Sequence, residues 1–451
     1  MNINIIGLSL LSIVFIFFSY ELLKTKNYMK IFGVILLSSI IIFLFYYNIL
    51  YLDMFSLTYW KSFIVILILI SFFVILNIIE EKTFDIYLLS TLVLLGSLVI
   101  IMCDHLLVIY LGLELQTFSF FILISKNRSS IKGSEAGLKY FILGALSSGL
   151  YLLGLSLFFL SGVSLNLSEV LFMSNDILIT IGFILIILSF AFKLALFPLH
   201  FWIPDIYEGS SWDIISLLST LPKISVLTIL IQLSINLNIL LFCALLSIVI
   251  GTIGALNQSK LKRLLAYSGI SHMGFIVLGY NLLSIEGYEI SYVYMSIYVI
   301  TMLTVFLMII NSPWKKDYYI IELSGLQYIN KLLALTWLLI FLSIAGIPPL
   351  SGFISKWLIL WNIINYDYLV SSLIGIIFSA IGAAYYLRIV KITYFQKQSS
   401  YLTWSKVLKI KTQSNEIQFY LLGFGVFFTC FLIINPNPLI TIINFIFFYF
   451  Y

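Results

Sequence analysis

Charged residues are scarce in this sequence, and their scarcity excludes most soluble folds. Only 10% of the 451 residues are charged, 62% are hydrophobic, and the mean hydropathy is +1.13. A soluble domain carries about a quarter charged residues. Apolar runs of about 20 residues recur along the chain, and each is long enough to cross a bilayer as a helix. The runs are too long and continuous for the strands of a membrane barrel, so we predict an all-α polytopic membrane protein.

Cysteine and glycine-rich motifs are also few, which argues against several kinds of site. Cys103, Cys243 and Cys430 are far apart and form no CxxC or Cys/His cluster. Disulfide frameworks, iron–sulfur ligation and structural zinc are therefore not expected. The sequence has no phosphate-binding loop and no flavin or nicotinamide fingerprint. We expect no cofactor and no metal in this chain, and we assign its net charge of +5 to membrane topology rather than to nucleic-acid binding.

Span lengths and polar breaks predict about 14 transmembrane helices. The first, Ile3 to Tyr20, lacks the features of a cleaved signal and is expected to be retained. The predicted spans are 3–20, 31–50, 60–79, 85–103, 105–125, 138–160, 176–208, 213–235, 238–257, 263–281, 289–311, 331–361, 368–394 and 417–434. The apolar tail after Pro436 and Pro438 is not counted as a further span.

The loops between these spans differ in charge, which predicts their sides of the membrane. Basic residues concentrate on the inner side of membrane proteins. One alternating set of loops carries Lys24, Lys26, Lys30, Lys82, Lys126, Arg128, Lys132, Lys260, Lys262, Arg263, Lys315, Lys316, Lys397, Lys406, Lys409 and Lys411. The other set holds acidic residues and, as its one notable cation, Lys61. We predict that the basic loops face inward and that both termini face outward.

Two spans are too long for one crossing, and each contains a proline break beside a lysine. One holds "FKLALFPLHFW" with Lys193, and the other holds "AGIPPLSGFISKW" with Lys356. Broken helices at matching positions of inverted repeats mark the transport path in many transporters. The two breaks lie five helices apart, which predicts two inverted five-helix repeats with discontinuous helices. The predicted units are 1–83, 84–237, 238–395 and a basic loop with a final helix at 396–451.

Four charged residues fall at membrane depth: Glu114, Lys193, Lys223 and Lys356. An unpaired charge at the bilayer centre costs at least a few kcal/mol, so such groups face the protein interior and pair or titrate. A structural ion pair between Glu114 and Lys193 is one interpretation. It leaves Lys223 and Lys356 without an acidic partner in this chain at similar depth. A buried unpaired lysine can titrate near neutrality, so a proton relay is favoured.

The proline breaks and two histidines fit such a relay. A proline frees backbone carbonyls at mid-membrane, which is tolerated only where protein or water satisfies them. His200 lies in the first break and can titrate near pH 7. His272, in "AYSGISHMGF", is a candidate too, although a purely structural hydrogen-bonding role is an equal alternative.

Several motifs together give the sequence a family resemblance. The motifs are "GLELQTFSF", "EAGLKYFILGALSSG", "FKLALFPLHFWIPDIYEGS", "PKIS", "KLKRLLAYSGISHMGF" and "AGIPPLSGFISKW". With these, roughly residues 105 to 395 resemble the antiporter-like membrane subunits of respiratory NADH:ubiquinone oxidoreductase (complex I). The "PDIYEG" turn is similar to that of the chain 2 type. The following "SSWDIIS" departs from the family's usual proline-containing run, so the path of that turn is not carried over.

The resemblance implies a role for each buried charge and for the whole chain. It implies Glu114 as the carboxylate partner of Lys193, Lys223 as the central relay lysine and Lys356 as the terminal lysine, where chain 4 bears a glutamate. NADH, flavin, iron–sulfur clusters and ubiquinone would bind elsewhere in the complex. Partners would include chain 4, small membrane subunits and lipids. The implied location is the mitochondrial inner membrane, with both termini in the intermembrane space; a bacterial plasma membrane is the alternative.

Two other functions remain open at this point. One is a stand-alone or multi-subunit cation/proton antiporter, which shares the glutamate and the lysines. The other is a scaffold whose relay is not used. The "PDIYEG" turn argues against the first, and the unpaired buried lysines argue against the second.

Overall fold

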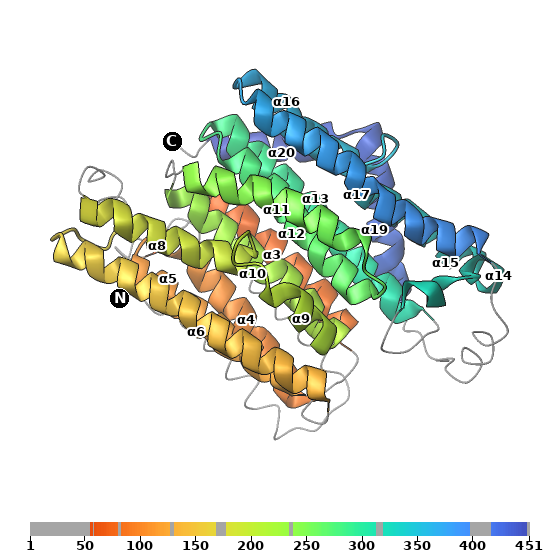
Figure 1. Ribbon diagram of the computed structural model, residues 1–451, viewed down its shortest axis with the longest axis horizontal. Coiled ribbons are helices and arrows are strands. Elements are labelled where there is room, and N and C mark those ends of the chain that lie inside the picture. Colours follow the sequence, from red (N-terminus) through yellow and green to blue (C-terminus); the bar gives the residue numbers. More distant parts are fainter. Residues whose placement is uncertain are drawn as a thin grey trace.

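The computed structural model describes residues 55–448, except for position 57 and the segments 80–82, 127–129, 168–176, 234–237, 313–318 and 397–415. The described part is helical, with isolated β-bridges and no strand (Figure 1). The predicted spans 3–20 and 31–50, the loop lysines 24, 26, 30, 82, 315 and 316, Arg128, and the basic loop 397–411 lie outside the described residues.

The described residues form a succession of helices along the chain. They are α3 (Tyr59–Ile78), α4 (Phe84–Met102), α5 (Leu106–Ser125), α6 (Ile131–Leu160), α8 (Ile177–Leu194), α9 (Trp202–Gly209), α10 (Trp212–Leu233), α11 (Asn238–Leu256), α12 (Leu261–Tyr280), α13 (Ile285–Asn311), the 3-10 helix η1 (Ile320–Leu323), α14 (Leu326–Ile329), α15 (Lys331–Ala345), α16 (Ser351–Asn365), α17 (Leu369–Phe395), α19 (Glu416–Ile434) and α20 (Asn437–Phe448). Within the described ranges, nine of these are long and apolar enough to cross a membrane. The polytopic helical class is therefore confirmed.

Both predicted breaks are present in the structure. The first span ends with α8 at Leu194, and α9 begins at Trp202 after a turn in which Ala195 has a positive φ of 58°. The second ends with α15, whose cap Gly346 has φ 82°, and α16 begins at Ser351. Glycine adopts this left-handed conformation without the steric penalty of a Cβ atom. Each break thus ends one half-helix and starts another inside a single predicted span.

The predicted start of one span is wrong. Helix α6 begins at Ile131 rather than at 138, capped by the Ser130 side chain, which accepts a hydrogen bond from Gly133 N at 3.2 Å. Its first turns tolerate charge because Lys139 pairs with Glu135 at 2.6 Å. Lys61, which the sequence places both in the predicted span 60–79 and among the charges of the outer loops, lies in the first turn of α3.

Lys61 is buried and its Nζ lies 2.6 Å from Asp104 Oδ1. Asp104 is in the turn between α4 and α5. The cation is therefore neutralised by an acidic residue of the same set of loops, which explains why a basic residue occurs at that end of the molecule.

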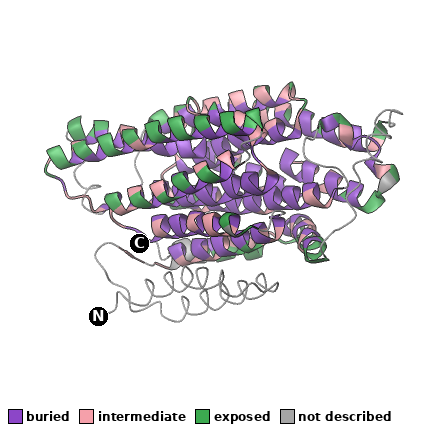
Figure 2. Cartoon of the chain, turned by 90° about the horizontal axis from the view of Figure 1, so that it is seen from below, coloured by how far each residue is buried: buried purple, intermediate pink, exposed green. Residues whose placement is uncertain are grey.

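The centre of the bundle consists of three helices that are buried on nearly all sides. They are α10, α12 and α13, whereas α5, α6 and α17 each expose an apolar face (Figure 2). In Figure 1, α5 and α6 lie at the lower left, α15 to α17 at the upper right, and the buried helices between them. Most side chains on α10, α12 and α13 are thus surrounded by protein.

One end of the bundle carries a cluster of ion pairs that joins α6, α9 and the start of α12. Glu208 pairs with Lys132 at 2.7 Å, Lys260 at 2.5 Å and Arg263 at 3.2 Å. Burial opposes ionisation of Glu208, but the hydrogen bonds from Lys132 and Lys260 outweigh it and lower its pKa to about 2. The cluster brings together cations from two of the predicted basic loops.

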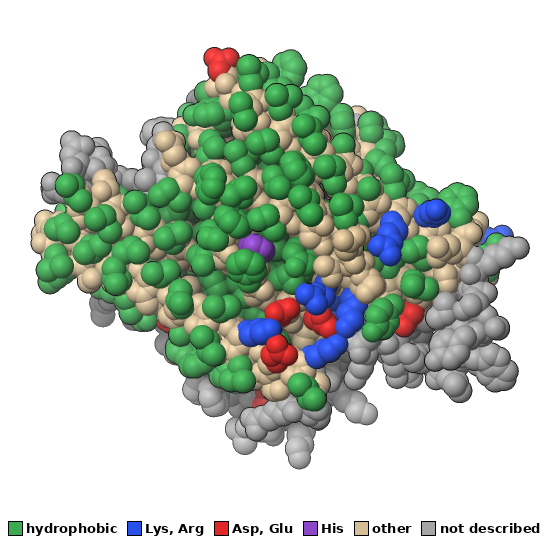
Figure 3. Space-filling view, in the orientation of Figure 1, with side chains coloured by type: hydrophobic (Ala, Val, Ile, Leu, Met, Phe, Trp, Pro, Cys, Tyr) green, Lys and Arg blue, Asp and Glu red, His purple; other side chains and the backbone are tan. Residues whose placement is uncertain are grey.

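The charged cluster stands out on an otherwise apolar face of the molecule. In Figure 3 hydrophobic side chains cover most of that face, and the acidic and basic side chains gather over α9 and the adjacent ends of α6 and α12. Next to the cluster, Lys262 Nζ donates a hydrogen bond to the Ser210 carbonyl at 2.8 Å and so fixes the turn at Ser210 and Ser211 to the start of α12. The "SSWDIIS" segment therefore continues from this turn directly into α10.

Candidate functional site

Glu114 lies in the middle of α5, on the edge of that helix's exposed apolar face. Its side chain is half-buried, and the hydroxyl of Thr117 donates to its carboxylate at 3.0 Å. Leu111, Leu115 and Phe118 are its exposed neighbours on the helix. The carboxylate is thus anchored by its own helix and remains open toward the outside of this chain.

Lys193 is on the last turn of α8, directly before the first break. Its Nζ is buried and has no hydrogen-bond partner in the described part of the chain. The rings of Phe192 and Tyr140 face the ammonium, with their centroids 5.8 and 5.9 Å from Nζ. Cation–π attraction of this kind stabilises a buried ammonium by about 0.5–2 kcal/mol.

Glu114 and Lys193 interact through space rather than by direct contact. No ion pair within 4 Å joins them, yet Glu114 is the acidic group that acts electrostatically on both Lys193 and Tyr140. Tyr140 on α6 is therefore a neighbour of both charged groups: its ring faces the Lys193 ammonium, and the Glu114 carboxylate acts on its hydroxyl. The structural ion pair that the sequence left open is not formed in this structure.

Lys223 occupies the centre of α10, one residue after the internal Pro222. It is 1% exposed, and its Nζ donates to the hydroxyl of Tyr298 on α13 at 3.0 Å, with the same ring 5.1 Å away. A proline inside a helix removes one backbone hydrogen bond. The central lysine is thus held by a tyrosine and not by a carboxylate among its described partners.

His272, on α12, lies between two tyrosines from different helices. Its Nδ1 is 2.8 Å from the hydroxyl of Tyr294 on α13, and its Nε2 is 3.1 Å from the hydroxyl of Tyr386 on α17. Its ring also packs 5.6 Å from the ring of Tyr298. Through that contact His272 is adjacent to the group that binds Lys223.

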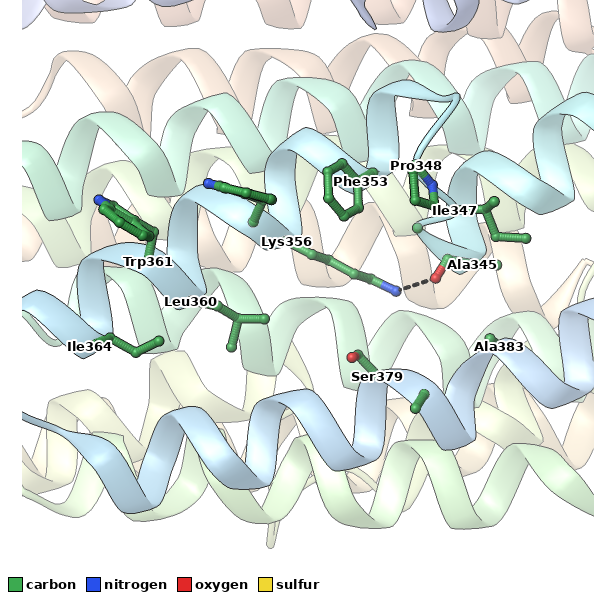
Figure 4. A pocket seen from close by; sticks show the side chains of 13 residues that line it. Ala345, Ile347, Pro348, Phe353, Lys356, Leu360, Trp361, Ile364, Ser379 and Ala383 are labelled. Atoms are coloured by element: carbon green, nitrogen blue, oxygen red, sulfur yellow. Dashed lines mark hydrogen bonds between the residues drawn. The ribbon is translucent and has the colours of Figure 1, made fainter.

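Lys356 lies on α16 just after the second break and points back into it. Its Nζ donates to the carbonyl of Ala345 at 2.8 Å and to that of Ile344 at 3.3 Å (Figure 4). These are the last carbonyls of α15, where the helix dipole is negative. A cavity of about 410 Å³ lies beside the ammonium, bounded by Trp361 on α16 and Ser379 on α17.

His200 is in the first break, as the sequence predicts, but no hydrogen bond joins it to the lysines in the described residues. Its ring lies against Phe201, with centroids 4.3 Å apart, and its Nδ1 has no hydrogen-bond partner there. The structure thus brings Lys223 and His272 into one contact network, and leaves His200 apart from it.

Sequence reasoning missed the tyrosines of this network. Tyr294 and Tyr298 are four residues apart in "SYVYMSIYVI" and so lie on one face of α13. Aromatic residues in apolar spans ordinarily indicate core packing, so the hydroxyl groups of these tyrosines were not considered as part of a polar site. Their repetition at helical spacing was the available signal. Among the described residues, no three His, Cys, Asp or Glu side chains are grouped so that they could hold a metal ion.

Comparisons with known proteins agree with these features. Residues 103–382 match the family model described as NADH:quinone oxidoreductase/Mrp antiporter, transmembrane. The chain is 41% identical over 359 residues to NADH-ubiquinone oxidoreductase chain 2 of Metridium senile, which covers 77% of this chain and 93% of that protein. The chain belongs to this family. Its likeness extends to NADH-quinone oxidoreductase subunit N of Pelagibacter ubique, with 39% identity over 335 residues, 70% of this chain and 71% of that protein.

Solved structures show that this family shares one fold. A chain of respiratory complex I from Thermus thermophilus aligns with a TM-score of 0.85 at 23% identity, covering 98% of this chain and 99% of that one. A chain of the Mrp complex from Dietzia sp. aligns with a TM-score of 0.82 at 16% identity, over 98% of this chain and 95% of that one. The family fold therefore holds in both assemblies.

Proposed function

We propose that this chain is a proton-translocating membrane subunit of respiratory NADH:quinone oxidoreductase. Two of its relatives are named as chain 2 and subunit N of that enzyme. The observation that carries the proposal is Lys223, a fully buried cation bound to a tyrosine hydroxyl at the centre of the bundle. A cation that serves only structure is expected to have a fixed counter-ion. A tyrosine hydroxyl can accept a hydrogen bond from the ammonium and donate one to the neutral amine, so it suits a lysine that gains and loses a proton.

The relay is assigned to four charged residues and one histidine. Glu114 receives or stabilises the proton at one edge of the bundle, and Lys193 carries it in the first break. Lys223 is the central carrier, and Lys356 is the terminal one in the second break. His272 is assigned to the connection between the last two, because its ring packs on Tyr298, the residue that binds Lys223. His200 is kept as a peripheral candidate because it borders the first break.

Two inverted five-helix repeats, 84–237 and 238–395, would place the two breaks symmetrically. The order of packing supports this arrangement. In the first unit α4 packs on α5, α5 on α6, α6 on α8 and α9, and α10 on α4. In the second, α11 packs on α12, α12 on α13, α13 on α15 and α16, and α17 on α11. The same neighbours recur in the same chain order, with the broken helix fourth in each unit.

The chain performs no electron transfer in this proposal. NADH, flavin, iron–sulfur clusters and ubiquinone bind elsewhere in the complex, and redox energy drives proton uptake and release here. Its partners are other membrane subunits, including chain 4 and small membrane subunits, together with lipids. We place it in the mitochondrial inner membrane, with the Glu208 cluster on the matrix side and both termini in the intermembrane space. A bacterial plasma membrane is the alternative location.

A cation/proton antiporter subunit is the second candidate, because the fold also occurs in an Mrp complex. The two are separated by purifying the tagged chain from its native membranes. Migration in a megadalton assembly that oxidises NADH supports the complex I function, and migration in a smaller assembly without that activity overturns it. The relay is tested in the same assembly with Lys223→Met, which should abolish NADH-driven proton pumping. Normal pumping by this variant would rule the relay out.

A further inference from the structure

The two broken spans differ in what binds the last carbonyls of the first half-helix. At the second break the ammonium of Lys356 donates to the carbonyls of Ala345 and Ile344. At the first break the indole of Trp202, the first residue of α9, donates from Nε1 to the Phe192 carbonyl in the last turn of α8 at 3.0 Å. A tryptophan thus takes at the first break the place that a lysine takes at the second.

The cap on α8 is complete without Lys193. A carbonyl oxygen has two lone pairs, and the Phe192 carbonyl also accepts a hydrogen bond from Ala195 N at 3.0 Å. The preceding carbonyl, of Ala191, accepts from Leu196 N at 2.9 Å. The Lys193 ammonium is buried and has no hydrogen-bond partner among the described residues. Unlike the lysine of the second break, it is not tied to the end of a half-helix.

The same indole packs on both aromatic rings that face the Lys193 ammonium. It stacks on the Phe192 ring with centroids 5.1 Å apart, and it meets the Tyr140 ring edge-on with centroids 5.7 Å apart. Those two rings lie 5.8 and 5.9 Å from Lys193 Nζ. Trp202 is only 4% exposed, so this packing is closed on nearly all sides.

Ion pairs fix α9, and with it the indole, against α6. Asp205 pairs at 2.7 Å with Lys139, the residue before Tyr140 on α6. Glu208, in the last turn of α9, pairs with Lys132 on α6, also at 2.7 Å. Because α9 is a helix of eight residues, about 12 Å long, two such pairs restrict its movement as a unit. The contact between the indole and the Tyr140 ring is therefore supported by charges that lie outside the break.

We propose that Trp202 is a positioning residue for Lys193, because its indole caps the end of α8 and holds the two facing rings against the ammonium. This inference rests on the proposed function, since it supposes that Lys193 carries protons. A carrier must bind its proton and also give it up. Cation–π contacts stabilise an ammonium without a hydrogen bond that ties it to one acceptor. The indole thus keeps the lysine in position and leaves its proton free to exchange.

The first test compares two buried tryptophans in the assembled complex. Trp202→Phe keeps an aromatic ring and removes the N–H that caps α8. The matched control is Trp337→Phe on α15, because Trp337 is 1% exposed and its Nε1 has no hydrogen-bond partner in the described part of the chain. We expect both variants to assemble. Trp202→Phe should pump protons at least about tenfold more slowly per complex than the control, because a displacement of about 1 Å at a reacting group can cost about 100-fold.

The second test removes one facing ring and leaves the cap intact. Phe192→Leu keeps the carbonyl that binds the indole. Its control is Phe183→Leu, which removes a buried ring on the same helix that packs on Phe158 with centroids 4.9 Å apart. We expect Phe192→Leu to lose pumping to a similar degree and the control to retain it. In both tests the KM values for NADH and quinone should stay unchanged, because these substrates bind elsewhere in the complex, whereas a general disturbance of the fold would change them.

The inference is overturned if Trp202→Phe pumps like Trp337→Phe, or if Phe192→Leu pumps like Phe183→Leu. It is also overturned if the lower rates come with altered KM values. Lys193→Met shows which hypothesis has failed. If Lys193→Met pumps normally, the failure lies in the proposed function; if it does not pump while the Trp202 and Phe192 variants do, only the positioning role is wrong.

Discussion

The Nζ atom of Lys356 lies 2.8 Å from the carbonyl oxygen of Ala345, the last residue of α15. A helix C-terminus carries a partial negative charge of about half an elementary unit. It therefore stabilises the ammonium, yet it leaves no bare anion when the lysine loses its proton. Within the described residues, Lys356 has no acidic partner, and the carbonyls of the break take that place.

Substitutions of Lys356 should separate charge from proton transfer. Lys356→Arg retains a cation that cannot release its proton, and Lys356→Met removes the charge. We expect both variants to assemble, and NADH-driven quinone reduction and proton pumping to fall in each. Activity and pumping are measured in native membranes and reconstituted vesicles. Wild-type pumping by the arginine variant would mean that Lys356 is a fixed cap on α15.

Gly346 controls the position of Lys356. A Cβ atom at Gly346 would lie 2.9 Å from Cδ and 3.2 Å from Nζ of Lys356, on a residue with φ 82°. Gly346→Ala should cost about 1–2 kcal/mol in backbone strain and displace the ammonium, which lowers pumping. Gly162→Ala is the control, because Gly162 has φ 72° and nothing within 4 Å of the added atom. Equal pumping in the two variants would show that the lysine's position is unimportant.

Glu114→Gln should impair pumping more than assembly. The amide keeps the shape of the carboxylate and removes the negative charge that acts on Lys193. The control is Glu135→Gln on α6, an exposed residue whose ion-pair partner is Lys139. Proton-to-electron ratios are compared in vesicles containing each assembled complex. A normal ratio for Glu114→Gln would remove that residue from the relay.

Glu208→Gln should destabilise the complex in a pH-dependent way. The pKa of Glu208 is lowered from 4.5 to about 2, so the folded state favours the charged form more than the unfolded state does. Its contribution is complete above pH 4.5 and is lost as the pH falls toward 2. We expect a loss of about 2 kcal/mol at pH 7, measured as a lower midpoint of thermal inactivation. The difference from wild type should shrink below pH 4.5; a constant difference would contradict the assignment.

Cysteine labelling tests the side of the membrane that the Glu208 cluster faces. Ser134 is exposed at the cluster end of α6, and Leu160, 72% exposed, lies at the opposite end of that helix. In mitoplasts, an impermeant thiol reagent should reach Leu160→Cys directly and Ser134→Cys only after permeabilisation. The reverse pattern would invert the proposed topology.

The sequence was informative where a polar residue interrupts an apolar run. Lys193 and Lys356 beside prolines predicted the two breaks, and hydropathy predicted the remaining described spans to within a few residues, apart from the start of α6. The ion pair of Lys61 with Asp104 was not predicted, because the two residues are 43 positions apart in sequence. Hydropathy is a local average and carries no information on such pairs.

The interior network could be predicted only in part. Lys223 and His272 stand out in apolar helices because each is costly to bury there. The tyrosines that bind them do not stand out in the sequence, because aromatic residues are common in the core of a membrane protein. The distance between Glu114 and Lys193 depends on how α5, α6 and α8 pack, which is a tertiary property.

The burial of α10 also has a consequence for how the chain is made. Lys223 on that helix is held by Tyr298, which lies 75 residues later in the sequence. During synthesis α10 is complete before α13 exists, so its lysine enters the bilayer without its hydroxyl partner. A charged residue in that position is costly to leave in lipid. Stable insertion of α10 therefore requires either the later synthesis of α13 or the help of an insertase. A chain that is truncated between α10 and α13 should leave α10 uninserted, on the ribosome side of the membrane.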